Sequence, residues 1–260
     1  MVSQSKNTRS PIKRPPLSKY VGEHIKVWNE LRKFYKFRKT FNPPVSGDGH
    51  PLLILPGFMA SDFSTNHFRR FLKEIGYTPY TWDLGRNYGN ISQLNILLKK
   101  IQNLHDKHQT KVSLIGWSLG GVYARQLAKA KPEFIRQVIT LGSPFAGINE
   151  PNNVVWLYKL INGKRKISKI DKKWMENIPG PAPVPTTAIY SKDDGIVPWE
   201  ACMELVEDEL HQNIEIKGTH LGMGFNPAVW TIVEDRLRYT LENWQAFAPA
   251  KASSPTQASL

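Results

Sequence analysis

The stretch at residues 111–125, KVSLIGWSLGGVYAR, constrains the fold of this chain more than any other. Its apolar start, residues 112–115, has the character of a buried strand, and the segment from Val122 onward has helical character with no breaker before Pro132. Between them lies GWSLG at residues 116–120, which fits the pattern G-x-S-x-G. The stretch therefore predicts a strand, a sharp turn and a helix in direct succession.

The residue that this turn presents is Ser118. Glycines two residues before and after a serine let the strand and helix backbones approach closely, and the strained turn exposes the hydroxyl. The amide of Leu119, at the start of the helix, would then donate a hydrogen bond to a developing oxyanion. Because so short a pattern also occurs by chance, a nucleophilic Ser118 requires partners. These are a second oxyanion donor, an acid and a base, with the acid before the base along the chain.

A second oxyanion donor is predicted after the apolar run at residues 51–55, PLLIL, which reads as a fully buried strand. This strand ends in Pro56, Gly57 and Phe58. In a sheet of this class, the second oxyanion amide comes from such a loop, so we expect it to be the backbone amide of Phe58. The alternative is an ordinary turn from a strand to a helix.

The acid is predicted at the end of a later strand, residues 186–190 (TTAIY). Two aspartates follow that strand, Asp193 and Asp194. We prefer Asp194 because the next residue, Gly195, permits a turn. Asp193 stays open as the alternative.

The base is predicted in the loop after the last strand, residues 214–217. This loop, GTHLG, places His220 between glycines, before a helix opened by Asn226 and Pro227. His211 precedes the same strand and would therefore lie at the wrong edge of the sheet. The ordered set of Ser118, acid and His220 favours His220 as the general base.

Strands and helical segments alternate through most of the chain, which predicts an α/β fold with a mostly parallel central sheet and helices on both faces. Residues 151–185 interrupt the alternation with Trp and Leu residues, a basic run and a cluster of four prolines at residues 179–185. We expect a small helical cap at about residues 148–185, unless this segment is a surface excursion without contact to a substrate. The folded domain is expected at residues 46–245, with a disordered tail at 246–260.

Residues 1–45 hold eleven Lys or Arg and two acids, so they contribute +9 to the chain's net charge of +13. From Ser18 to about Thr40 the pattern predicts a basic amphipathic helix. Its apolar stripe is formed by Val21, Ile25, Trp28, Leu31 and Tyr35. This stripe either attaches to an anionic bilayer surface or packs on the domain.

Composition narrows the function further. The single cysteine, Cys202, excludes an intrachain disulfide, and nothing in the sequence has the spacing of a metal site, so we expect neither metal nor cofactor. There is no apolar run of 18 or more residues and no apolar segment after the basic start, so we expect neither a spanning helix nor a secretory signal. A cytoplasmic location is expected, with peripheral membrane contact through the basic helix as the open question. Nucleic acid is not the expected partner.

Five motifs in order carry a resemblance to a known superfamily. They are LPGF, GWSLGG, GSPF, SKDDGIVPW and GTHLGMGFNP, beginning at residues 55, 116, 142, 191 and 218. With them, residues 50–243 resemble the α/β-hydrolase superfamily, in particular bacterial lipase and esterase-like members. The resemblance implies Ser118 as nucleophile, Asp194 as acid, His220 as base, and the amides of Phe58 and Leu119 as oxyanion hole. Unlike many lipases, the chain has Pro56 where a histidine often precedes the glycine of the oxyanion loop.

The residues and the resemblance together predict a serine hydrolase that forms an acyl-enzyme. Its expected substrate is a small-molecule or lipid ester, since the predicted cap and the loop after the acid are rich in Trp and Leu. Two alternatives remain. The same triad could pass the acyl group to an alcohol, as in an acyltransferase, or the chain could be a membrane-binding module with an inactive triad.

Overall fold

The computed structural model describes residues 12, 15–41, 45–146 and 177–248. Within them, six strands form one sheet in the order β2-β1-β3-β4-β5-β6, and every neighbouring pair is parallel. The strands are β1 (Pro51–Leu55), β2 (Thr78–Tyr80), β3 (Val112–Trp117), β4 (Ile135–Leu141), β5 (Thr186–Ser191) and β6 (His211–Ile216). The predicted parallel sheet is confirmed.

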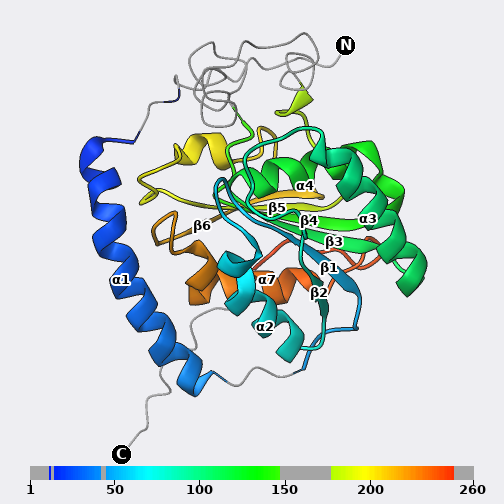
Figure 1. Cartoon of the computed structure of the whole chain (residues 1–260), viewed down its shortest axis with the longest axis horizontal. Helices are drawn as coiled ribbons and strands as arrows, with labels where there is room; N and C mark the ends of the chain where they lie inside the picture. Colours follow the sequence, from blue (N-terminus) through cyan, green and yellow to red (C-terminus); the bar gives the residue numbers. More distant parts are fainter. Residues whose placement is uncertain (1–11, 13–14, 42–44, 147–176, 249–260) are drawn as a thin grey trace, which may run out of the picture.

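Helices cover both faces of this sheet (Figure 1). The α-helices are α1 (Leu17–Thr40), α2 (Asn66–Glu74), α3 (Gln93–His108), α4 (Leu119–Ala130) and α7 (Pro227–Leu237). The described residues also form four 3-10 helices, namely η1 (Asp62–Thr65), η2 (Pro132–Phe134), η3 (Trp199–Cys202) and η4 (Met223–Phe225).

The side chains of β1 show how one strand serves two cores. Leu52 and Ile54 pack in a cluster with α1, α2 and α7, whereas Leu53 and Leu55 pack in a second cluster with α3 and α4. Successive side chains of a strand point to opposite faces, so a strand buried on both sides must be apolar throughout. The run PLLIL meets this requirement, and all five residues are buried.

The connections place the carboxyl ends of β1 and β3 at a special point of the sheet. From β1 the chain passes to β2 on one side, and then crosses to β3 on the other side of β1. Open α/β sheets bind ligands beyond the carboxyl ends of their strands, where the strand order reverses in this way. Leu55 and Gly116 are partners in the register of β1 and β3, so the loops after these strands begin side by side.

The N-terminal helix forms where it was predicted, but it packs with a different face. Ile25 is 66% exposed and Trp28 is 70% exposed, so these two residues of the apolar stripe do not pack on the domain. The buried residues of α1 are Glu23 and Phe34. Phe34 packs edge-on against Trp230 of α7, with ring centroids 5.0 Å apart. A stripe chosen by hydrophobicity misses this face because a buried carboxylate is part of the contact.

The predicted cap falls largely outside the described residues, since these omit 147–176, and the tail from residue 249 also lies outside them. The described end of the cap segment, residues 177–185, is held by α4. There, Lys129 Nζ donates to the carbonyl of Asn177 at 2.6 Å, and Arg125 donates to the carbonyl of Gly180 at 2.8 Å. Among the helices described here, none has the length and apolar character needed to cross a bilayer.

Candidate active site

The turn between β3 and α4 holds Ser118 in a strained conformation, with φ 53° and ψ −121°. Only a few per cent of residues other than glycine have positive φ, and such strain gathers at functional sites. The flanking glycines explain how the turn closes. A Cβ on Gly116 would lie 2.3 Å from the Cα of Gly121, and one on Gly120 would lie 2.1 Å from the carbonyl oxygen of Leu55. The close approach predicted for this pattern is therefore present.

The loop after β1 lies directly against the serine. A Cβ on Gly57 would be 3.3 Å from the Cβ of Ser118, so Phe58, the next residue, belongs to the backbone beside the hydroxyl. Leu119 follows Ser118 in the chain and is the first residue of α4. Both residues predicted to supply the oxyanion amides thus flank Ser118.

Asn87 holds this loop in place, a role that could not be assigned from the sequence. Its side chain is fully buried and donates to the carbonyl of Pro56 at 2.8 Å. Its carbonyl accepts from Met59 N at 2.7 Å, and its amide donates to the carbonyl of Ala60 at 2.9 Å. Three hydrogen bonds from one residue therefore fix the backbone on both sides of Phe58. An asparagine in a glycine-containing loop at the carboxyl edge was the available signal.

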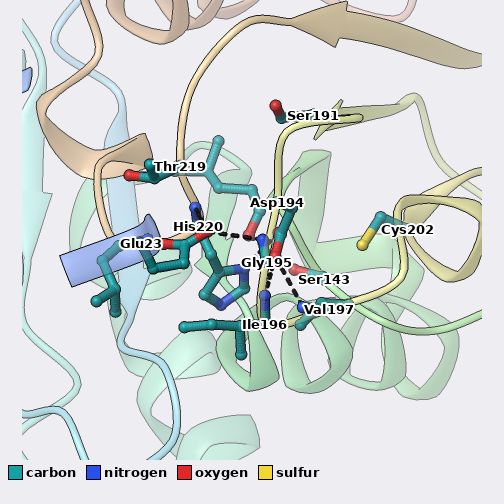
Figure 2. Close-up of polar contacts among 12 residues, drawn as sticks. Glu23, Ser143, Ser191, Asp194, Gly195, Ile196, Val197, Cys202, Thr219 and His220 are labelled. Atoms are coloured by element: carbon teal, nitrogen blue, oxygen red, sulfur yellow. Dashed lines mark hydrogen bonds and ion pairs between the residues drawn. The ribbon is translucent and has the colours of Figure 1, made fainter. Parts of the chain in front are cut away.

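The predicted acid, Asp194, and the predicted base, His220, lie in contact with each other (Figure 2). Asp194 Oδ2 lies 2.6 Å from His220 Nδ1, and both side chains are buried. The other carboxylate oxygen accepts from the amides of Ile196 at 2.8 Å and Val197 at 2.7 Å. A carboxylate held in this way fixes the imidazole with its proton on Nδ1 and leaves Nε2 to act as base. Asp193, the alternative acid, is exposed.

Ser118 is joined to this pair through the end of β4. Its amide donates to the carbonyl of Leu141 at 2.8 Å. A Cβ on the next residue, Gly142, would lie 3.1 Å from His220 Nδ1. Within the described residues no hydrogen bond connects the Ser118 hydroxyl to the imidazole, and in unliganded sites such bonds often tighten only when substrate binds.

Gly195 has a different purpose from the one that its position after Asp194 suggested. The φ of Gly195 is not positive, so the backbone conformation there does not require a glycine. Instead, a Cβ there would lie 2.4 Å from the carbonyl oxygen of Lys19 in α1. The loop of the acid is therefore built to receive the N-terminal helix.

Glu23 of α1 is the second residue that the sequence analysis missed. It binds the loop that follows β5 and the loop that follows β6 (Figure 2). Its Oε1 accepts from the amides of Gly195 at 2.7 Å and His220 at 2.9 Å, and its Oε2 accepts from Leu221 N at 3.2 Å. Glu30 adds a bond from Thr219 N at 2.9 Å. The two acids of this basic helix are seven residues apart, which places them on one face, and that spacing was the signal in the sequence.

The charges around His220 set its protonation. Burial lowers the pKa of this imidazole, but the charge and hydrogen bond of Asp194, together with the charge of Glu23, outweigh burial, and the pKa lies above its ordinary value. A general base must be neutral to accept a proton. Activity that uses His220 is therefore present above this raised pKa and is lost as the pH falls through it.

A second Ser-His-Asp chain lies at the amino edge of the sheet. His50 Nε2 is 2.8 Å from Ser113 Oγ, and His50 Nδ1 is 2.5 Å from Asp48 Oδ1. Ser113 is completely buried on β3, and burial lowers the pKa of His50 despite the neighbouring Asp48. His211 is also at this edge, as predicted, bonded to the carbonyl of Ala182 at 2.8 Å. No substrate can reach this serine, so we interpret the cluster as structural.

A parallel sheet with a strained serine turn after β3, and with acid and histidine loops after β5 and β6, defines an α/β-hydrolase. Residues 51–192, more than half of the chain, match the family described as palmitoyl protein thioesterase. The chain belongs to this family. It is therefore an α/β-hydrolase of the ester-hydrolysing kind. The matched range includes the serine turn and ends just before Asp194.

Solved structures show the same fold at low sequence identity. Aspergillus fumigatus lipase B is similar with a TM-score of 0.57 and 16% identity over 77% of this chain, and the match spans 55% of that lipase's length. A monoacylglycerol lipase of Paleococcus ferrophilus gives 0.55 and 18% over 76% of this chain and 96% of its own. A Pyrococcus furiosus esterase gives 0.54 and 16% over 78% and 84%. No curated protein matches the sequence.

Proposed function

We propose that this protein is a serine hydrolase that cleaves carboxylic esters of hydrophobic acyl groups through an acyl-enzyme. The observation that carries the proposal is the 2.6 Å bond between Asp194 and His220, located at the sheet edge that also presents the strained Ser118. A serine hydroxyl is a weak nucleophile unless a base removes its proton, and an imidazole oriented by a buried carboxylate is such a base.

The chemistry follows from these positions. Ser118 Oγ attacks the acyl carbon while its proton passes to His220 Nε2, and the carbonyl oxygen becomes an oxyanion that accepts hydrogen bonds from the amides of Phe58 and Leu119. The tetrahedral adduct collapses, and the imidazolium gives its proton to the leaving alcohol or thiol. Water then attacks the acyl-enzyme with His220 again as base, which releases the acid and regenerates the serine.

The surface next to the oxyanion loop favours a substrate with a hydrophobic acyl group. Met59 and Tyr88 are exposed apolar side chains, and they stand on the two loops that Asn87 joins. Apolar side chains with a few placed polar groups are typical of ligand sites. The name of the matched family adds a thioester of a long acyl chain to the candidate substrates. We therefore include thioesters with oxygen esters in the proposed range.

The purified full chain should be labelled covalently by a fluorophosphonate and should hydrolyse a series of acyl oxygen esters and thioesters. We expect kcat/KM to increase with acyl length, because each buried methylene contributes about 0.8 kcal/mol of binding. Rates should be measured by release of free acid, with and without an added alcohol. Heat-denatured protein is the control for labelling.

Two results would contradict the proposal. Absence of both labelling and hydrolysis would indicate an inactive triad, as in a membrane-binding module. Formation of a new ester as the main product when alcohol is present would indicate an acyltransferase that uses the same residues.

A further inference from the structure

The outward side of α1 combines apolar and basic side chains and carries no acid. The two acids of the helix, Glu23 and Glu30, point inward to the loops of the site. The outward side chains are exposed, and we call them the outer face of α1: Leu17, Val21, Ile25, Trp28, Arg32, Tyr35, Lys36 and Lys39. Figure 1 shows the helix along the outside of the molecule. The inward acids leave the outer face with only positive charge.

We propose that the outer face of α1 docks the protein on an anionic lipid bilayer. A helix with a basic face and exposed Trp, Ile and Val is suited to lie in the interface, where apolar side chains enter the acyl boundary and lysines and arginines meet acidic headgroups. The charge complementarity is strong, because residues 1–45 carry +9 of the chain's +13. Nucleic acid is a poorer match, since aliphatic Val21 and Ile25 have no partner on a phosphate backbone.

The outer face of α1 takes no part in the serine chemistry, but the same helix is bonded to the loops of the site. The inner side of the same helix is bonded to the backbone of Gly195 and His220 through Glu23. A bilayer that holds α1 would therefore hold the loops of the acid and the base at a fixed orientation to the lipid. Docking on a bilayer is a property in addition to the proposed hydrolysis of dispersed esters.

Sedimentation of the full chain with vesicles tests this surface. The protein should bind phosphatidylcholine vesicles that contain phosphatidylserine, and added salt should weaken binding because the attraction is screened. Ile25→Glu should weaken the partition about tenfold or more, because it removes an inserted side chain and introduces a negative charge that the anionic headgroups repel. Ile96→Glu is the matched control, since Ile96 is 53% exposed on α3, on the other face of the sheet.

Equal partition to neutral and anionic vesicles would contradict the proposed docking surface. Equal losses of vesicle binding in the Ile25 and Ile96 variants would contradict it as well. Binding to duplex DNA but not to anionic vesicles would assign the charge to nucleic acid instead. Circular dichroism of both variants should show unchanged folding, because both side chains are exposed.

The inner side of α1 supports a second inference from different observations. We infer that Glu23 is a positioning residue for Asp194 and His220, a role that rests on the proposed hydrolase function. Its carboxylate is fully buried and joins the residue after the acid to the base itself. These loops are 172 and 197 positions away from Glu23 in the chain. One side chain thus fixes the separation of two loops that must stay in register within a fraction of an ångström.

Glu23→Gln tests this role because it keeps the shape and one carbonyl oxygen but removes the charge and leaves an amide donor facing a backbone N–H. We expect kcat/KM to fall at least about tenfold as the loops lose register. The charged groups that act on His220 are Asp194 and Glu23, and both raise its pKa. Removing Glu23 should therefore shift the acid limb of the pH profile to lower pH.

Glu30→Gln is the matched control on the same helix, since Glu30 bonds Thr219 and is not among the groups that shift the pKa of His220. Its acid limb should stay in place. A lower melting temperature of Glu23→Gln with an unmoved pH profile would reduce Glu23 to a structural residue and overturn the inference. If the wild type hydrolyses no ester, titration of His220 by NMR in both variants still measures the shift, so failure of the proposed function is distinguishable.

Discussion

Replacing Ser118 with alanine should abolish ester hydrolysis and fluorophosphonate labelling while the protein remains folded. The loss should reach about 10⁴-fold or more, because without the hydroxyl no acyl-enzyme can form and only the oxyanion donors and substrate binding remain. The Ser118 hydroxyl makes no hydrogen bond within the described residues, so its removal leaves no buried group unpaired there. Rates of acid release and a labelling gel measure the effect.

Ser113→Ala is the matched control, with the same change on β3, the strand that leads to Ser118. It breaks the second Ser-His-Asp chain by removing the partner of His50 Nε2 at 2.8 Å. A buried group that loses its partner costs about 1–3 kcal/mol, so the melting temperature should fall while activity per folded molecule stays unchanged. Retained activity in Ser118→Ala, or lost activity in Ser113→Ala at a temperature where it is folded, would contradict the assignment of the nucleophile.

The fold and the order of the site could be predicted because local patterns determine them. A strand buried on both faces must be apolar, and the short apolar runs PLLIL and VSLI are typical of such strands. Parallel strands all end at one edge, so Ser118, Asp194 and His220, each placed after a strand, had to come to the same side. His211 could be set aside by the same argument, and it does lie at the amino edge.

The supporting residues could not be predicted because their partners are distant in the chain. Asn87 bonds the backbone of Pro56, and Glu23 bonds Gly195 and His220, and neither contact leaves a periodic pattern. The packing face of α1 could not be predicted for the same reason. Hydrophobicity alone ranks Trp28 as the buried residue and Glu23 as the exposed one, whereas a carboxylate that accepts three backbone amides is stable in a buried position.

Exchanging the carboxylate of the acid for an amide should separate Asp194 from Asp193. In Asp194→Asn, the side-chain oxygen can still accept from the amides of Ile196 and Val197, so the loop keeps its shape. The amide nitrogen would then face His220 Nδ1 and donate to it, which moves the imidazole proton to Nε2. That nitrogen can no longer take the serine proton, and a loss of roughly 10⁴-fold in kcat is expected when geometry is preserved.

Asp193→Asn is the matched control one residue earlier. Its side chain is exposed on the groove between α1 and the loop after β6, where it has no bond to His220, so activity should change by less than about twofold. A pH profile adds a second readout. Raising the pH neutralises the imidazole but does not move its proton from Nε2, so Asp194→Asn should stay inactive throughout. Recovery at high pH would show that only the charge of Asp194 matters, and a larger loss in Asp193→Asn would make Asp193 the acid.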